Sequence, residues 1–243
     1  MPRMIERIRA TILFGTWGGA LAFLGPFCIV LTAITRVPEF VTLPTMATIY
    51  AGLFLARVRF IIEGRDRVDP GGTYVYVANH QSMLDPPMIW VALGTPRHRI
   101  GYLFKSQVLK VPLLGSGAQI IGMIPVDRAN RDQAVESVRR ATESLRAGQS
   151  FGVFAEGTRT RTGALLPFKK GAFYMAIGAG VPVVPVTIDG AYHAMPPGSF
   201  RLRRVPVRVV IHDPIPTEGM VEADVDTLLE RTRTAVGSAL SVA

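Results

Sequence analysis

The chain has 243 residues, of which 49% are hydrophobic and 19% charged, and this composition excludes a disordered or fibrous protein. Its single cysteine excludes a disulfide framework and a zinc site built from cysteines. A net charge of +9 on so hydrophobic a chain indicates an apolar body beside an anionic partner, with membrane lipid, nucleic acid and phosphorylated metabolites as candidates.

The N-terminal part is the most apolar, with an uncharged run from Ala10 to Thr35. As one straight helix this run would be about 39 Å long, more than the roughly 30 Å core of a bilayer. Gly25-Pro26 predicts a kink within it, because proline removes a helical hydrogen bond. Arginines flank the run at both ends, which favours a helical hairpin in one leaflet and leaves a single tilted span as the alternative.

A signal peptide is disfavoured, because the apolar run is about twice the usual length of such a segment. The next apolar stretch, residues 44–59, either lies on the membrane or packs on the following domain. We therefore predict membrane-anchoring helices over residues 1–59, and a membrane-associated protein with its active site on the cytoplasmic face.

Residues 60–243 alternate strand and helix patterns, which predicts one α/β domain with a mostly parallel mixed sheet flanked by helices. A helix pattern runs from Ala134 to Leu145 with Asn130 as its cap, and another from Val221 to Leu240. The predicted strands are Phe60–Glu63, Tyr74–Ala78, Ile120–Val126, Phe151–Phe154, Val183–Ile188 and Val205–Ile211.

His80 follows the strand predicted over 74–78, and loops after the carboxyl ends of such strands are where sites tend to form. Asp85 precedes two prolines and indicates the start of a helix. If the chain turns between them, Asp85 can orient the imidazole, which can then act as a general base at neutral pH. Alternatively, His80 only fills the loop and Asp85 only caps the helix.

Two further strand patterns end in arginine. Residues 151–159 pass from an apolar run into Glu-Gly-Thr-Arg, and Arg159 can bind a phosphate through two hydrogen bonds. Residues 120–128 end in Arg128 in the same way. Either arginine alone is compatible with a solvated surface charge, but together with the His80 loop they favour a phosphate-binding catalytic site.

Four motifs in this order resemble those of the lysophosphatidic acid acyltransferases and related glycerolipid acyltransferases. They are Asn79–Asp85, which matches the family's His-x4-Asp motif, and then Gly122–Arg128, Phe154–Arg159 and Val181–Val186. The resemblance covers about half of the chain. Two positions depart from it: Pro125, where the family commonly has phenylalanine, and Ala155, where it usually has proline.

The resemblance implies that His80 deprotonates an acceptor hydroxyl and that Asp85 is its partner. It also implies an acceptor-phosphate site made by Lys105, Arg128, Glu156, Gly157, Thr158 and Arg159. The reaction would move a fatty acyl chain from a thioester, carried by coenzyme A or acyl carrier protein, to the sn-2 hydroxyl of 1-acylglycerol-3-phosphate. Such a thioester is already activated, so no acyl-enzyme is needed and a nucleophilic Ser82 is disfavoured. No cofactor beyond the thioester is expected, and no metal, because no acidic or histidine cluster has the spacing of metal ligands.

Other acceptors stay open, namely glycerol-3-phosphate, another lysophospholipid or a lyso-ornithine lipid. A non-catalytic protein that binds anionic membranes is the alternative of a different class. A nucleic-acid partner is not expected, because the chain lacks an aromatic-basic motif. Residues 97–170 hold thirteen basic and five acidic residues, so nearly all of the excess charge lies in the part of the chain that carries the predicted phosphate ligands.

Overall fold

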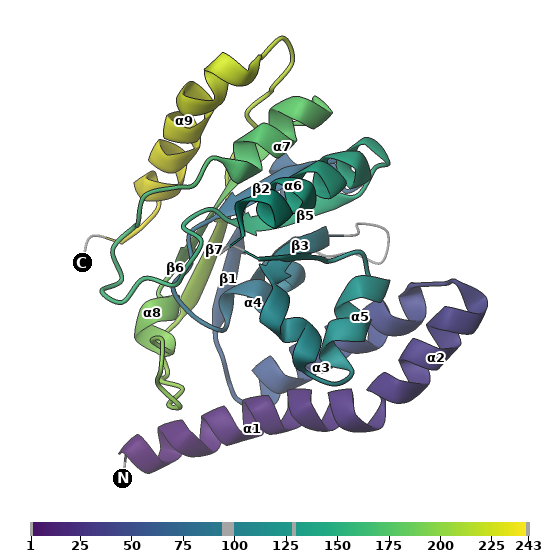
Figure 1. The fold of residues 1–243 in the computed structure, drawn as a ribbon. Helices are drawn as coiled ribbons and strands as arrows, with labels where there is room; N and C mark the ends of the chain where they lie inside the picture. Colours follow the sequence, from purple (N-terminus) through teal and green to yellow (C-terminus); the bar gives the residue numbers. More distant parts are fainter. Residues whose placement is uncertain (1, 94–99, 128–129, 242–243) are drawn as a thin grey trace.

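A computed structural model describes residues 2–93, 100–127 and 130–241. Within these residues it contains nine helices around one seven-stranded sheet with the strand order β1-β7-β6-β2-β5-β3-β4 (Figure 1). The helices are α1 Pro2–Phe23, α2 Gly25–Thr35, α3 Glu39–Leu55, α4 Asp85–Leu93, α5 Leu114–Ile120, α6 Arg131–Arg146, α7 Gly171–Ala179, α8 Ala191–Ala194 and α9 Val225–Ser238. The strands are β1 Phe60–Glu63, β2 Val75–Ala78, β3 Ile100–Lys105, β4 Ile124–Val126, β5 Ser150–Phe154, β6 Val183–Asp189 and β7 Val207–Ile211.

The predicted mostly parallel mixed sheet is confirmed. Strands β2, β3, β4, β5 and β6 run parallel to one another, β7 is antiparallel to β6, and β1 is parallel to β7. The carboxyl ends of the five parallel strands therefore meet at one edge of the sheet. Both faces of the central strands are buried: Tyr76 and Ala78 of β2 pack on one side, Val75 and Val77 on the other. This explains why β2 is a continuous apolar run without alternation.

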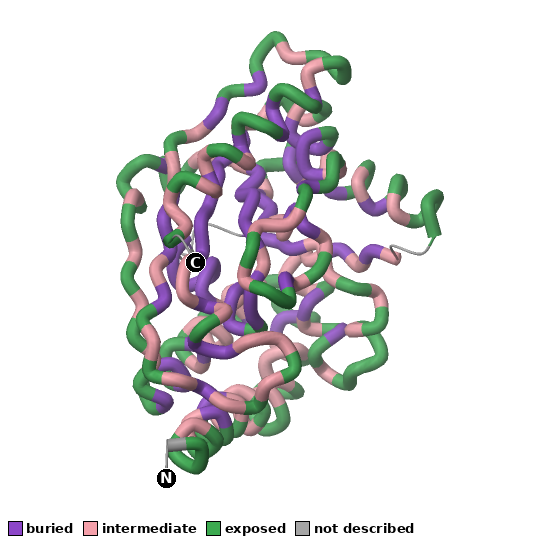
Figure 2. Tube along the Cα trace, turned by 90° about the vertical axis from the view of Figure 1, so that its left-hand side faces the viewer, coloured by how far each residue is buried: buried purple, intermediate pink, exposed green. Residues whose placement is uncertain are grey.

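The two faces of the sheet are covered by different helices. Helices α6, α7 and α9 lie on one face, and α4 lies on the other with α1 and α3 beyond it (Figure 1). Figure 2 shows that the buried residues concentrate in the strands and in the helices packed directly on them. Helices α1 and α3 are part of the same core, since Leu13 and Leu53 are buried in one apolar cluster with strand β2.

The kink predicted at Gly25-Pro26 is confirmed. Helix α1 ends at Phe23, α2 begins at Gly25, and their axes differ by 48°. No single helix among the described residues has both the length and the apolar composition to cross a bilayer. The bent pair of α1, counted from Arg3, and α2 meets both criteria when the two helices are taken together.

Several predicted boundaries are confirmed, including β1 and the Asn130 cap, whose side chain accepts a hydrogen bond from the backbone of Gln133. The strand predicted from Ile120 is wrong in its first half. Helix α5 extends to Ile120, and Gly122, with a φ of 80°, turns the chain into β4 at Ile124. Strand β3 was not predicted.

Candidate active site

The polar network lies where the chain leaves the carboxyl ends of β2 and β5, which are neighbours in the sheet. His80 follows β2 by two residues, and Glu156 follows β5 by two residues. The two loops are joined directly: the backbone N–H of His80 donates to the Glu156 carboxylate at 2.8 Å, and its carbonyl accepts from Thr160 at 2.9 Å. Two motifs separated by more than seventy residues thus form one site.

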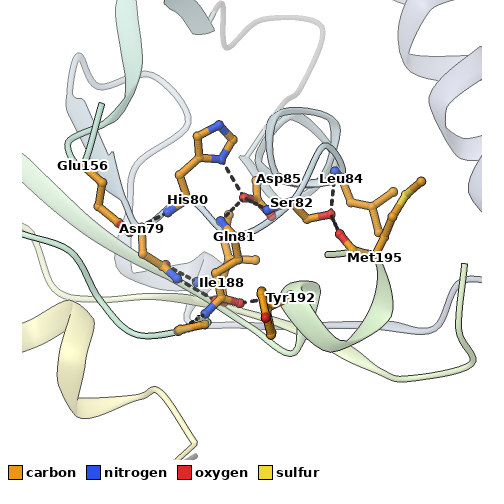
Figure 3. A network of polar contacts seen from close by, with 11 residues as sticks. Asn79, His80, Gln81, Ser82, Leu84, Asp85, Glu156, Ile188, Tyr192 and Met195 are labelled. Atoms are coloured by element: carbon orange, nitrogen blue, oxygen red, sulfur yellow. Dashed lines mark hydrogen bonds and ion pairs between the residues drawn. The ribbon is translucent and has the colours of Figure 1, made fainter. Parts of the chain in front are cut away.

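The contact predicted between His80 and Asp85 is confirmed. Nδ1 of His80 lies 2.7 Å from Oδ2 of Asp85, whose side chain is completely buried (Figure 3). The same oxygen accepts hydrogen bonds from the backbone N–H groups of Gln81 at 2.6 Å and Ser82 at 2.7 Å. Asp85 is the first residue of α4. Its carboxylate accepts hydrogen bonds from the loop before the helix and therefore does not cap the helix.

The imidazole of His80 is held in one orientation by contacts on its edge and on its face. A carboxylate can only accept hydrogen bonds, so Nδ1 carries the proton in the neutral ring and Nε2 is left as the basic nitrogen. Phe154, the last residue of β5, stacks on the ring with centroids 4.2 Å apart. The His80 side chain is 19% exposed, so the ring is accessible but largely shielded from water.

The loop that carries His80 is fixed to neighbouring segments by buried polar side chains. Asn79 exchanges two hydrogen bonds of 2.8 Å with the backbone of Ile188 and so continues the pairing of β2 with β6. Ser82 is fully buried, and its hydroxyl donates to the carbonyl of Met195 at 2.7 Å. A hydroxyl enclosed in this way is poorly placed to act as a nucleophile.

Glu156 contacts backbone amides rather than facing an acceptor. Its side chain is buried; Oε1 accepts from His80 and Oε2 accepts from the backbone N–H of Leu166 at 3.2 Å. Burial raises the pKa of this carboxyl to about 7, against the opposing effect of the two backbone hydrogen bonds. These contacts give Glu156 a role in supporting the His80 loop, and its expected part in the acceptor-phosphate site stays a prediction.

The pKa of Glu156 predicts a pH-dependent stability. A carboxyl of higher pKa in the folded state binds its proton preferentially there, so the stability that this proton supplies is present below about pH 4.5 and is lost as the pH rises to about 7. We expect the free energy of unfolding to fall over this range by on the order of 1–3 kcal/mol more in the wild type than in Glu156→Gln. Urea titrations of both proteins at pH 5 and pH 8 measure this, and equal pH dependence in the two would contradict it.

Gly157, Thr158 and Arg159 follow Glu156 in the loop after β5 but differ in their surroundings. Gly157 has a φ of 72°, and a Cβ there would approach the Lys169 side chain to 2.9 Å, so its conformation explains the glycine. Thr158 is exposed. Arg159 is half-buried, and its Nη1 is buried with no hydrogen-bond partner among the described residues. A buried guanidinium nitrogen without an acceptor is an unsatisfied donor that an anion can complete.

Lys105 ends β3 and is exposed, and none of the described polar contacts connects it to the His80 network. Arg128 lies outside the described residues; β4, which ends at Val126, is the edge strand next to β3. Strand spacing puts the ends of β3 and β4 about 10 and 14 Å from that of β2. No group of three or more histidine, cysteine, aspartate or glutamate side chains in the described part of the chain is placed to hold a metal ion.

Asn79 and Phe154 each begin one of the four motifs, but the sequence assigns neither of them a role. Their roles depend on contacts with β6 and with the His80 ring that the sequence does not specify. The structure also gives Ala155 a specific contact. Its backbone N–H donates to the carbonyl of Ala78 at 3.2 Å, a hydrogen bond that proline at this position could not make.

The fold and site define an α/β protein with a histidine–aspartate pair at the carboxyl edge of a mostly parallel sheet, and with a half-buried arginine whose Nη1 has no partner among the described residues. A family model described as Acyltransferase matches residues 59–189, and the chain belongs to this family. Similar proteins include a chloroplastic 1-acyl-sn-glycerol-3-phosphate acyltransferase of Brassica napus, 38% identical over 63% of this chain and 44% of the relative. The human 1-acyl-sn-glycerol-3-phosphate acyltransferase alpha is 33% identical over 74% of this chain and 63% of its own.

The matches thus span roughly half to two thirds of these relatives' length. The fold is also similar to the crystal structure of the 1-acyl-sn-glycerophosphate acyltransferase PlsC from Thermotoga maritima. That comparison has a TM-score of 0.79 and 25% sequence identity, and it covers both chains completely.

Proposed function

We propose that this chain transfers a fatty acyl group from a thioester to the sn-2 hydroxyl of 1-acylglycerol-3-phosphate, giving phosphatidic acid. The observation that carries the proposal is the orientation of His80, whose Nδ1 is bonded to buried Asp85 while Nε2 has no hydrogen-bond partner among the described residues. Lipid adhesion alone does not require such a pair. The names of the relatives from Brassica napus, human and Thermotoga maritima support the same reaction.

In this mechanism Nε2 of His80 takes the proton of the acceptor hydroxyl as its oxygen attacks the thioester carbonyl carbon. Asp85 stabilises the imidazolium that forms. The tetrahedral intermediate then expels the thiolate of coenzyme A or acyl carrier protein, which takes the proton back from His80. The C–S bond is broken and a C–O bond is formed, with no covalent acyl-enzyme and no cofactor beyond the thioester co-substrate.

The acceptor phosphate is assigned to Arg159, with Lys105 and Arg128 as further cations from the neighbouring strands. The unsatisfied buried Nη1 of Arg159 supports this assignment, because a phosphate oxygen would supply its missing acceptor. The charge of residues 97–170 is consistent with it, since that segment carries most of the net positive charge.

Membrane attachment through α1, α2 and α3 belongs to the same proposal. A surface helix of a globular protein normally turns polar residues outward, but the exposed face of α1 presents Met4, Ile8 and Ile12. Phe23 is 85% exposed and Phe27 is 70% exposed around the α1–α2 bend. This apolar surface suits the acyl region of the cytoplasmic leaflet, from which a lysophospholipid acceptor would reach the site.

Arg159→Gln is expected to weaken use of the phosphorylated acceptor, raising its KM by about 10–100-fold, because a charge-assisted hydrogen bond to phosphate is lost. The KM for the acyl thioester should change by much less. Initial rates with each substrate varied separately provide the measurement. Arg161→Gln, which removes an exposed arginine of the same loop, serves as the control. Equal increases in both KM values would remove Arg159 from the acceptor site.

The experiment that tests the function is an acceptor panel with one labelled acyl-CoA, repeated with acyl carrier protein. It contains 1-acylglycerol-3-phosphate, the same lipid without its phosphate, glycerol-3-phosphate, a second lysophospholipid and a lyso-ornithine lipid. The proposal predicts that 1-acylglycerol-3-phosphate has the highest kcat/KM of the panel. A preference for another acceptor would mean that the chain is an acyltransferase with a different acceptor. No transfer to any acceptor would favour the alternative, a non-catalytic membrane-binding protein.

A further inference from the structure

The loop between α8 and β7, residues 195–206, extends from α8 to the N-terminal part of α1 (Figure 1). The backbone of Leu202 fixes it there: its N–H donates to the carbonyl of Glu6 at 3.0 Å, and its carbonyl accepts from Arg9 at 3.1 Å. The Leu202 side chain is completely buried. This loop, which we call the 195–206 loop, therefore packs firmly on α1, although the two segments are nearly two hundred residues apart in the sequence.

The loop carries an aromatic residue and three arginines, of which Phe200 and Arg204 are exposed and Arg201 and Arg203 are half-buried. Phe200 stacks on Phe14 of α1 with ring centroids 5.8 Å apart and remains 53% exposed, so it extends the apolar face of α1. Arg201, Arg203 and Arg204 follow, and no ion pair joins them to a carboxylate within the described residues. An exposed aromatic ring beside unpaired arginines is the combination expected at the headgroup level of a membrane.

Other arginines converge on the same place. The Arg9 guanidinium also donates to the carbonyls of Ala56 and Arg57, both at 2.9 Å, which brings the end of α3 beside the loop. Burial and the nearby charges of Arg204 and Arg57 lower the pKa of Arg9, and Glu6 is the acidic group that acts in the opposite direction. Arg9, Arg57 and Arg204 thus form a cluster of like charge that an external anion would stabilise.

We propose that the 195–206 loop is a second lipid-contacting element, in which Phe200 inserts at the membrane surface and Arg201, Arg203 and Arg204 bind anionic headgroups. The inference rests on the membrane attachment proposed above and adds a segment outside the N-terminal helices. Lipid is favoured over an acidic carrier protein because the arginines adjoin the apolar stripe of α1, which suits acyl chains better than a charged protein surface. The loop begins at Met195, whose carbonyl holds Ser82, so the bound surface would lie next to the His80 loop.

The insertion is tested with a single environment-sensitive fluorophore on the full chain in a Cys28→Ser background. The label is placed at Ser199→Cys beside Phe200, at Phe23→Cys in the N-terminal helices, and at Val135→Cys, which is exposed on α6 across the sheet. With vesicles of phosphatidylcholine and about 30 mol% phosphatidylglycerol, we expect the labels at positions 199 and 23, but not 135, to move to an apolar environment.

The electrostatic part is tested by partitioning onto the same vesicles. Arg201→Gln/Arg204→Gln should bind about 30-fold more weakly, since each arginine near an anionic surface contributes on the order of 1 kcal/mol. Arg140→Gln/Arg231→Gln removes the same charge from exposed positions on α6 and α9 and should bind as the wild type does. Binding to pure phosphatidylcholine vesicles should not distinguish the two variants.

The outcomes separate this inference from the proposed function. A response at position 23 without one at 199 overturns the role of the loop and leaves membrane attachment standing. No response at either position overturns both. A response at 199 to acyl carrier protein but not to vesicles, or equal losses of binding in the two double variants, also overturns the lipid assignment.

Discussion

His80→Ala is expected to lower the rate of acyl transfer by about 10²–10⁴-fold or more, because the acceptor hydroxyl loses its general base. Membrane association should be unchanged, since the apolar faces of α1, α2 and α3 are untouched. The measurement is the initial rate of product formation from labelled acyl-CoA, combined with vesicle sedimentation of the same protein.

The matched control is His193→Ala, which removes an exposed histidine from α8 and should retain full activity. Full activity in His80→Ala would contradict the general-base assignment. Joint loss of activity and membrane binding would point to misfolding, and the folded state would then be checked with His80→Gln, which preserves most of the side chain's volume.

Two substitutions of Asp85 are expected to separate its role in orienting the His80 ring from its role in the stability of the protein. Asp85→Ala leaves three donors without an acceptor: Nδ1 of His80 and the backbone N–H groups of Gln81 and Ser82. Breaking a buried pair of this kind typically costs about 3–5 kcal/mol, so we expect a lower free energy of unfolding together with loss of activity.

Asp85→Asn keeps an oxygen for those donors but removes the charge that stabilises the imidazolium. We expect it to remain close to the wild type in stability while kcat falls about 10³–10⁴-fold and the KM values change little. Urea titration and steady-state kinetics of both variants, with the exposed Asp213→Asn as control, measure the difference. Retention of kcat in Asp85→Asn would leave Asp85 a structural role only.

The sequence predicted the order of the fold well because most strands are short apolar runs bounded by turns. Strand β3 was missed because its character depends on tertiary contacts: Gly101 lies against the ring of Phe151 and the carbonyl of Gly122, and a side chain at this position would collide with both. The run 120–126 was assigned to one strand because α5 and β4 are joined without any polar residue between them.

For the site, the motifs indicated which residues come together but not the direction in which each side chain points. The loop between His80 and Asp85 permits their pairing, and the family resemblance implies it, whereas the inward direction of the Glu156 carboxylate does not follow from its place in a motif. Its carboxylate and the Arg159 guanidinium are only three residues apart, yet one is satisfied by backbone amides and the other has an unpaired nitrogen. Such differences arise from the path of the loop after β5, which local sequence does not determine.

The central claim is that the acceptor hydroxyl, activated by His80, attacks the thioester directly. The most direct test is the intact mass of the protein after incubation with acyl-CoA in the absence of acceptor, followed by addition of 1-acylglycerol-3-phosphate. We expect an unchanged protein mass before the addition and phosphatidic acid after it. A mass increase of one acyl group, transferred to the lipid when the acceptor is added, would contradict direct attack and establish an acyl-enzyme instead.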